Sequence, residues 1–174
     1  SPDGFLSLSV PDSTPQLSVM HDLNFEHYPG DLPKAYSRYY RSFFPRFAKK
    51  AARIVTVSEF SKQDIVNHYG VPADRIDVVH NGVSAVYAPL AVDEQRAVRE
   101  KLTGGAPYLI CVGSMHARKN VARLLLAFDR IAAEQPTLRL VFVGEQMFHD
   151  ARMEEAWAQV KHKDRVVFTG RLGQ

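Results

Sequence analysis

The chain has 174 residues, of which 45% are hydrophobic and 24% charged, and it contains a single cysteine. This composition excludes a disordered chain, a collagen and a disulfide scaffold, because the apolar fraction is ordinary and one thiol cannot form an internal bridge. No apolar run reaches the roughly 18 residues that a membrane helix needs, and the first residues do not resemble a signal peptide. We therefore expect a soluble, cytoplasmic chain.

The net charge of +3 is spread unevenly along the sequence. Residues 34–53 hold seven basic residues and no acidic one, and aromatic residues recur among them at helical spacing. This pattern predicts a helix with an aromatic core face and a solvated basic face, kinked or broken at Pro45. The alternative is that the basic face binds a partner, either anionic lipid headgroups at the inner face of a membrane or an anionic acceptor. A nucleic-acid partner is not expected, because no recognised motif accompanies the basic residues.

The first half of the chain alternates short apolar runs with helical patterns. Strands are expected over residues 17–20, 54–57 and 76–79. The basic helix separates the first two strands. Ser58 is a favourable helix N-cap and Gly70 a favourable helix end, so a second helix is expected between them. The pair Asn81-Gly82 is typical of a turn and closes the third strand.

The second half repeats this alternation after a linker at residues 85–92. Its expected strands cover residues 108–112, 138–143 and 165–168, and its expected helices cover 93–101, 121–132 and 150–162. The strand at 108–112 is apolar throughout, which is typical of a parallel strand buried on both faces. Strands separated by helices predict an α/β fold, and the composition change at the linker predicts two parallel sheets, each incomplete.

The loop over residues 113–120 carries most of the candidate chemistry. It connects an expected strand to a helix that Asn120 can cap, and ligands of α/β sheets bind beyond such strand ends, where helix N-termini attract anions. Gly113 allows close approach of a phosphate, and Arg118 and Lys119 add two cations. The loop lacks the three glycines of a dinucleotide fingerprint and the Walker A pattern. It therefore predicts a phosphate site without metal ligands, or else a solvent-exposed basic loop.

Five segments of the sequence, taken in order, resemble the group-1 (family 4) retaining glycosyltransferases, and the mannosyltransferase-like members in particular. These segments are residues 19–23 (VMHDL), 57–62 (VSEFSK), 79–83 (VHNGV), Gly113 and 118–120 (RKN). The resemblance implies the GT-B fold, which has two facing Rossmann-like lobes. It assigns the acceptor lobe to residues 1–88 and the donor lobe to residues 89–174.

The resemblance also implies transfer of a hexose from a sugar nucleotide, such as a GDP- or UDP-hexose, with retention of configuration. The acceptor would be a saccharide or a lipid-linked saccharide, as in cell-surface polysaccharide synthesis, and no cofactor or metal would be needed. Arg118 and Lys119, with Gly113 and Ser114, would bind the donor diphosphate and stabilise the departing nucleotide. Many relatives carry an arginine where Ser114 stands. Leu172 would lie near the nucleotide base.

In the first lobe, the resemblance makes His21 a catalytic residue that approaches the transferred sugar. Asp22 is expected to organise the turn rather than act as a base. Asn81 and Gly82 would form the turn before the interdomain connection, with the glycine at a positive φ.

Two parts of the family pattern are not found in this sequence. They are the acidic motif with two glutamates expected after Gly170 and the glycine-bearing loop expected early in the first lobe. On this basis we expect a central fragment of an enzyme, with weak or no activity by itself. The alternative is a non-catalytic module that binds a nucleotide or another anion.

Overall fold

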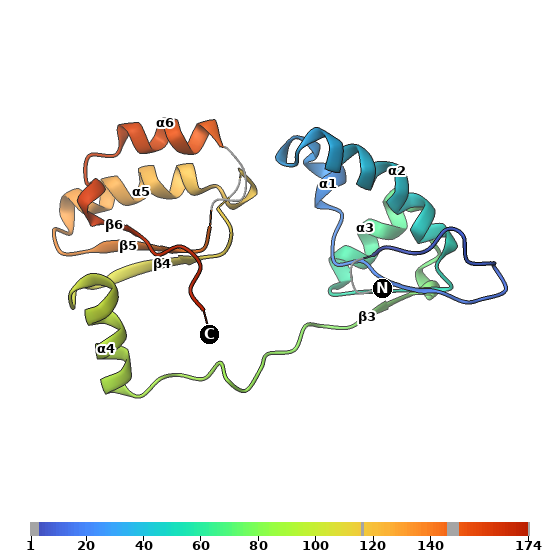
Figure 1. The fold of residues 1–174 in the computed structure, drawn as a ribbon, viewed down its shortest axis with the longest axis horizontal. Helices are drawn as coiled ribbons and strands as arrows, with labels where there is room; N and C mark the ends of the chain where they lie inside the picture. The colour runs from blue at the N-terminus through green and yellow to red at the C-terminus, as the bar shows by residue number, and fades with distance from the viewer. Residues whose placement is uncertain (1–3, 116, 146–149, 174) are drawn as a thin grey trace. The chain divides into compact units, whose positions relative to one another are not determined.

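The structure, a computed structural model, describes residues 4–115, 117–145 and 150–173. The chain divides into two compact units, Ser1–Tyr87 and Ala88–Gln174, which are described separately below (Figure 1). Within the described ranges, every helix is too short or too polar to cross a bilayer.

Three short parallel strands form the sheet of the first unit. They are β1 (Leu17–Val19), β2 (Arg53–Thr56) and β3 (Ile76–Val78), in the order β1-β2-β3. Ile54 in the central strand lies opposite Ser18 on one side and Ile76 on the other, and all three side chains are buried. Because the strands are parallel, their carboxyl ends lie at one edge of the sheet, which is where His21 follows β1.

The helices of the first unit are α1 (Asn24–His27), α2 (Lys34–Lys50) and α3 (Glu59–Tyr69), with 3₁₀ turns η1 (Pro29–Asp31) and η2 (Ala73–Arg75). The expected ends of α3 are confirmed, because the Ser58 Oγ accepts a hydrogen bond from the Ser61 amide at 3.1 Å and Gly70 is left-handed. Pro45 does not end α2, which continues to Lys50. Burial of Phe44 and Phe47 on either side of the proline offsets its missing amide.

The second unit contains a second parallel sheet with the order β4-β5-β6. Its elements are α4 (Val92–Thr103), β4 (Tyr108–Val112), η3 (Ala117–Lys119), α5 (Val121–Glu134), β5 (Arg139–Val143), α6 (Ala151–Gln159), η4 (Lys163–Arg165) and β6 (Val166–Phe168). Helices α5 and α6 lie on the same face of the sheet (Figure 1). The buried core of this unit includes Leu125 and Phe128 from α5 and Leu140 and Phe142 from β5.

Strand β4 is less buried than its apolar sequence predicts. Its Leu109, Ile110 and Val112 are 42%, 53% and 66% exposed, so the expectation of a strand buried on both faces is wrong. The physical reason is its place in the sheet: β4 is an edge strand among the described residues. Neighbouring side chains of a strand point to opposite faces, so exposure of both Leu109 and Ile110 means that neither face of β4 is fully covered.

Candidate functional site

Three glycines form the carboxyl edge of the second sheet, one after each strand. Gly113, Gly144 and Gly170 have φ values of 131°, 137° and 67°, which are conformations that glycine adopts far more readily than other residues. The Gly144 amide donates to the Gly170 carbonyl, and the Gly113 amide donates to the Val143 carbonyl, each at 2.9 Å. A Cβ at Gly144 would overlap the Gly113 carbonyl oxygen and lie 2.7 Å from its carbon. The edge is therefore built of closely packed backbone.

We call residues 113–120 the basic loop, and its two ends are anchored in the core. The Met115 amide donates to the Glu145 carbonyl at 2.9 Å, and the Met115 side chain is buried. At the other end Val121 is buried as the first residue of α5. The 3₁₀ turn Ala117–Lys119 lies between these anchors, and His116, in the same loop, lies outside the described residues.

Lys119 lies over Gly113, the glycine that begins the loop. Its Cε is 3.8 Å from the position that a Cβ would take on Gly113. Both Arg118 and Lys119 are exposed, and neither forms an ion pair within the part of the chain that the structure describes. Ser114 is half-buried beside Gly113. Of the two predicted cations, Lys119 therefore lies beside Gly113, and both Arg118 and Lys119 lack an acidic partner in the described ranges.

Asn120 does not cap α5 with its side chain, which corrects the expectation from its residue type. It adopts a left-handed backbone conformation with φ 54° and makes no side-chain cap bond. The first hydrogen bond at this end runs from the Leu124 amide to the Asn120 carbonyl, at 3.3 Å. The amides of the first turn of α5 are therefore not satisfied within the helix, and their partial positive charge adds to that of Arg118 and Lys119.

Leu172 follows β6 at the same edge of the sheet and is 53% exposed. In the sheet, β5 lies between β6 and β4, the strand that leads into the basic loop. Reasoning from the sequence assigned no role to Gly144 or Gly170. Gly144 directly follows an apolar strand, which is the signal that singled out Gly113, and Gly170 follows β6 after one threonine.

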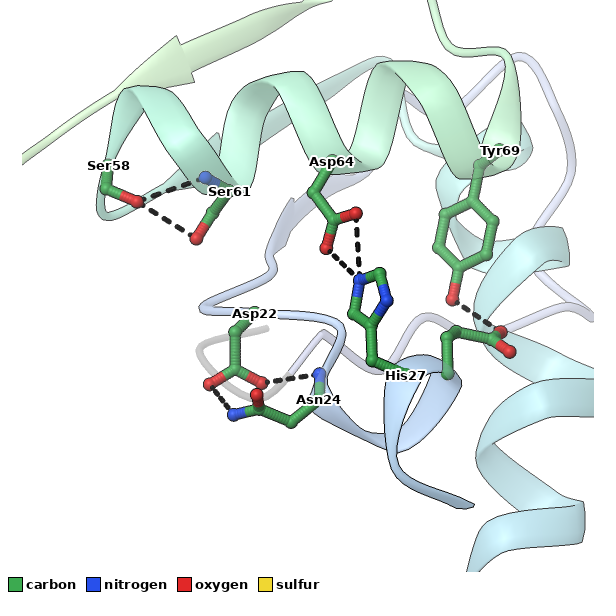
Figure 2. Close-up of polar contacts among 8 residues, drawn as sticks. Asp22, Asn24, His27, Ser58, Ser61, Asp64 and Tyr69 are labelled. Atoms are coloured by element: carbon green, nitrogen blue, oxygen red, sulfur yellow. Dashed lines mark hydrogen bonds and ion pairs between the residues drawn. The ribbon is translucent and has the colours of Figure 1, made fainter. Parts of the chain in front are cut away.

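His21 lies at the carboxyl edge of the first sheet and is exposed. It lines a cavity of about 350 Å³ together with aromatic side chains that include Phe25, Tyr40 and Phe44. Asp22 organises the turn after it, as predicted: its carboxylate accepts hydrogen bonds from the Asn24 amide at 3.1 Å and the Asn24 Nδ2 at 2.7 Å (Figure 2).

Asn81 and Gly82 do not form the expected turn. They lie in an exposed, irregular segment after β3, and Gly82 is not among the glycines with positive φ. The turn lies further along, where the Tyr87 amide donates to the Ser84 carbonyl at 3.0 Å. An Asn-Gly pair after an apolar strand favours a turn, but here the pair begins an irregular connection into the second unit.

The basic helix α2 is partly neutralised by acidic neighbours. Arg41 pairs with Glu26 at 3.1 Å, and Lys50 pairs with Asp12 at 2.9 Å. Just beyond the helix, the Arg53 Nε donates to Asp77 at 2.7 Å across β2 and β3. The basic side chains that remain without an acidic partner among the described residues are Lys34, Arg38, Arg46 and Lys49.

Comparison with known proteins accounts for both units. Residues 2–86 match Glycosyltransferase Family 4, and residues 106–174 match Glycosyl transferases group 1. The chain belongs to the family 4, group 1 glycosyltransferases. The resemblance found in the sequence segments is thereby confirmed.

Curated relatives of this glycosyltransferase chain are longer than it is, and the matched segments cover about a third of each. It is 30% identical over 119 residues to the O-antigen chain mannosyltransferase B of Escherichia coli, covering 68% of this chain and 31% of that protein. It is 29% identical over 131 residues to the spore coat protein SA of Bacillus subtilis, covering 67% and 34%. The chain thus spans about a third of the length of these relatives.

Solved structures show the same fold. Anabaena Alr3699/HepE, in complex with UDP and glucose, matches with a TM-score of 0.69 and 17% identity over 92% of this chain and 42% of that one. A mutant of S. aureus TarM matches with a TM-score of 0.63 and 17% identity over 91% and 29%. The predicted fold class, α/β with two small parallel sheets of the GT-B type, is confirmed.

Proposed function

We propose that this glycosyltransferase chain provides the nucleoside-diphosphate site of an enzyme that transfers a hexose from a sugar nucleotide to an acceptor with retention of configuration. The observation that carries the proposal is the placement of Lys119 over Gly113, beside Arg118 and the uncapped start of α5. Two cations without acidic partners among the described residues, next to free amides, favour a doubly charged anion such as a diphosphate. The similarity to the O-antigen chain mannosyltransferase B of Escherichia coli and to Anabaena Alr3699/HepE in complex with UDP and glucose supports the substrate class.

The proposed role of the basic loop is to hold the diphosphate and to stabilise the charge that develops on it as the sugar departs. Gly113 and Ser114 would contact the phosphates closely, while Arg118 and Lys119 supply positive charge that other transferases take from a metal ion. The acceptor hydroxyl would then attack the same face of the sugar. Leu172 is proposed to lie beside the nucleotide base.

The first unit is proposed to serve the sugar and the acceptor. His21 lines a cavity whose walls include the aromatic rings of Phe25, Tyr40 and Phe44, and such rings provide apolar faces for a saccharide or the start of a lipid. We assign His21 as a catalytic residue of the complete enzyme. The expected domain roles are therefore acceptor binding by residues 1–88 and donor binding by residues 89–174.

The test compares Lys119→Ala with Lys101→Ala in the intact protein. Lys101 is an exposed lysine of α4 in the same unit, so its replacement matches the change in charge outside the basic loop. A thermal-shift screen with GDP-, UDP- and ADP-hexoses first identifies the donor, because a ligand that binds the native state raises its stability. We expect Lys119→Ala to lower turnover by about 100-fold or more while Lys101→Ala has no effect.

Unaltered turnover in Lys119→Ala would refute the proposed role of Lys119 in binding the donor diphosphate. His21→Ala separates the two proposed roles, because it should lower turnover while leaving the donor-induced thermal shift in place. A protein that binds a sugar nucleotide without turning it over with any acceptor would instead be the non-catalytic binding module.

A further inference from the structure

We infer that the first unit contains a binding site for one divalent transition-metal ion, formed by His27, Asp64 and His68. Each residue offers one ligand atom, and these three atoms lie within 4.8 Å of one another. The proposed diphosphate site uses none of the three. The sequence motifs described above do not include them either, because His27 is 37 residues from Asp64.

The elements of the first unit bring the three side chains together. Asp64 and His68 are four residues apart on α3, and this spacing places both on one face of the helix. His27 is the last residue of α1, and its Nε2 lies 2.8 and 2.9 Å from the two carboxylate oxygens of Asp64 (Figure 2). The rings of His27 and His68 are 5.3 Å apart between centroids and nearly perpendicular. Two imidazoles and a carboxylate therefore converge from two helices.

The charge balance around Asp64 favours a cation. Its side chain is only 13% exposed, and its hydrogen-bonding partner among the described residues is His27. A carboxylate removed from water needs a compensating positive charge, which a bound metal ion would supply. The neighbouring Glu26 does not compete for the ion, because it is occupied by Arg41 and by the Tyr69 hydroxyl, which donates to it at 3.0 Å.

The ligand types select the kind of metal. Imidazole nitrogens with one carboxylate suit Zn²⁺, Co²⁺ or Ni²⁺ far better than Mg²⁺ or Ca²⁺, which prefer sets made only of oxygen. Ligands bound to one such ion at about 2.1 Å lie within about 4.2 Å of each other. The site therefore needs a small rotation of side chains, which the exposure of His27 and His68 permits. Water would complete the coordination. The bound ion would link α1 to α3 and so hold the segment that follows His21.

The test titrates the metal-free chain, made without a histidine tag, with Co²⁺ and Zn²⁺ alone. Absorption of the Co²⁺ complex and calorimetry with Zn²⁺ should both show one ion per chain. His68→Ala is the decisive variant, because it removes one ligand and leaves the hydrogen bond between His27 and Asp64 intact. We expect it to weaken binding by at least about tenfold, since even the loss of an outer partner of a metal ligand has an effect of this size. Asp64→Asn should act in the same direction.

The matched control is His80→Ala, which removes an exposed histidine of the same unit that lies outside the cluster. It should bind Co²⁺ and Zn²⁺ as the unaltered chain does. Zn²⁺ should also raise the melting temperature of the unaltered chain and of His80→Ala, but not that of His68→Ala. The inference is overturned if the unaltered chain binds neither ion at micromolar concentration, or if His68→Ala binds as tightly as His80→Ala.

Discussion

Replacement of Gly144 by alanine tests whether close backbone packing builds the proposed diphosphate site. The variant meets two obstacles: a φ of 137°, which L-residues rarely adopt, and a Cβ that would overlap the Gly113 carbonyl oxygen. The obstacle at Gly113 is backbone, so it cannot rotate away as a flexible side chain would. The Gly113 backbone must move, and with it the surface that Lys119 covers.

The matched control is Gly170→Ala. Gly170 also has a positive φ, of 67°, but no atom lies within 4 Å of the position that its Cβ would take. Its alanine therefore bears the conformational cost alone, about 1–2 kcal/mol. At position 144 the overlap adds about 1–3 kcal/mol, the usual cost of forcing extra atoms into a packed site. The difference between the two variants should be at least about 1 kcal/mol, which is a melting-point difference of about 4–8 °C for a unit of this size.

The assay can be confined to the second unit, because the chain has a single tryptophan and Trp157 lies on α6, where it packs against Phe168. Its fluorescence should show Gly144→Ala unfolding at a lower temperature than Gly170→Ala. In the intact protein, the stabilisation by the preferred sugar nucleotide should also be weaker in Gly144→Ala. Equal melting temperatures and equal nucleotide responses in the two variants would refute the reasoning.

Three further predictions concern stability and surface charge. Burial raises the pKa of Asp129, but hydrogen bonds from the His162 amide and ring and from the Lys161 amide outweigh burial and leave this pKa below its ordinary value. The stabilisation by the ionised Asp129 should therefore be fully present above about pH 3.9 and be lost as the pH falls further. In tryptophan-monitored urea unfolding, the free energies of unfolding of the unaltered chain and of Asp129→Asn should then differ at neutral pH and converge at the lower pH. Arg165→Met should lose about 2–4 kcal/mol in the same assay at neutral pH, because the buried Arg165 Nη1 donates to the Ala132 and Gln135 carbonyls at 2.7 and 3.0 Å, whereas exposed Arg130→Met should lose almost nothing. If α2 contacts anionic membranes, the double variant Arg38→Ala, Lys49→Ala should sediment with anionic vesicles to a smaller extent than the unaltered chain. Equal binding of the unaltered chain to anionic and neutral vesicles would exclude the electrostatic contact.

The positions of the strands could be predicted from the sequence because each lies in a short segment rich in apolar residues, and a glycine directly follows β4 and β5. The basic loop could be predicted for the same reason, since it directly follows such a run. The exposure of β4 could not be predicted, because Leu109 and Ile110 are apolar whether or not another layer covers them. The requirement for glycine at position 144 depends on the approach of Gly113, which lies 31 residues earlier and becomes a neighbour only in the folded sheet.

The two concentrations of positive charge differ in a way that their sequences do not show. Residues 34–53 hold more cations, yet Arg41, Lys50 and Arg53 face acidic partners in the folded unit. Arg118 and Lys119 have no such partner among the described residues, and the loop that carries them is anchored at both ends in the core. Anchoring lowers the entropy that binding must overcome, and the absence of a counter-charge leaves the full attraction for a ligand. The shorter basic segment is nevertheless the stronger candidate for binding a diphosphate, because Lys119 lies beside Gly113 and the segment leads into the first turn of α5, whose amides also attract an anion.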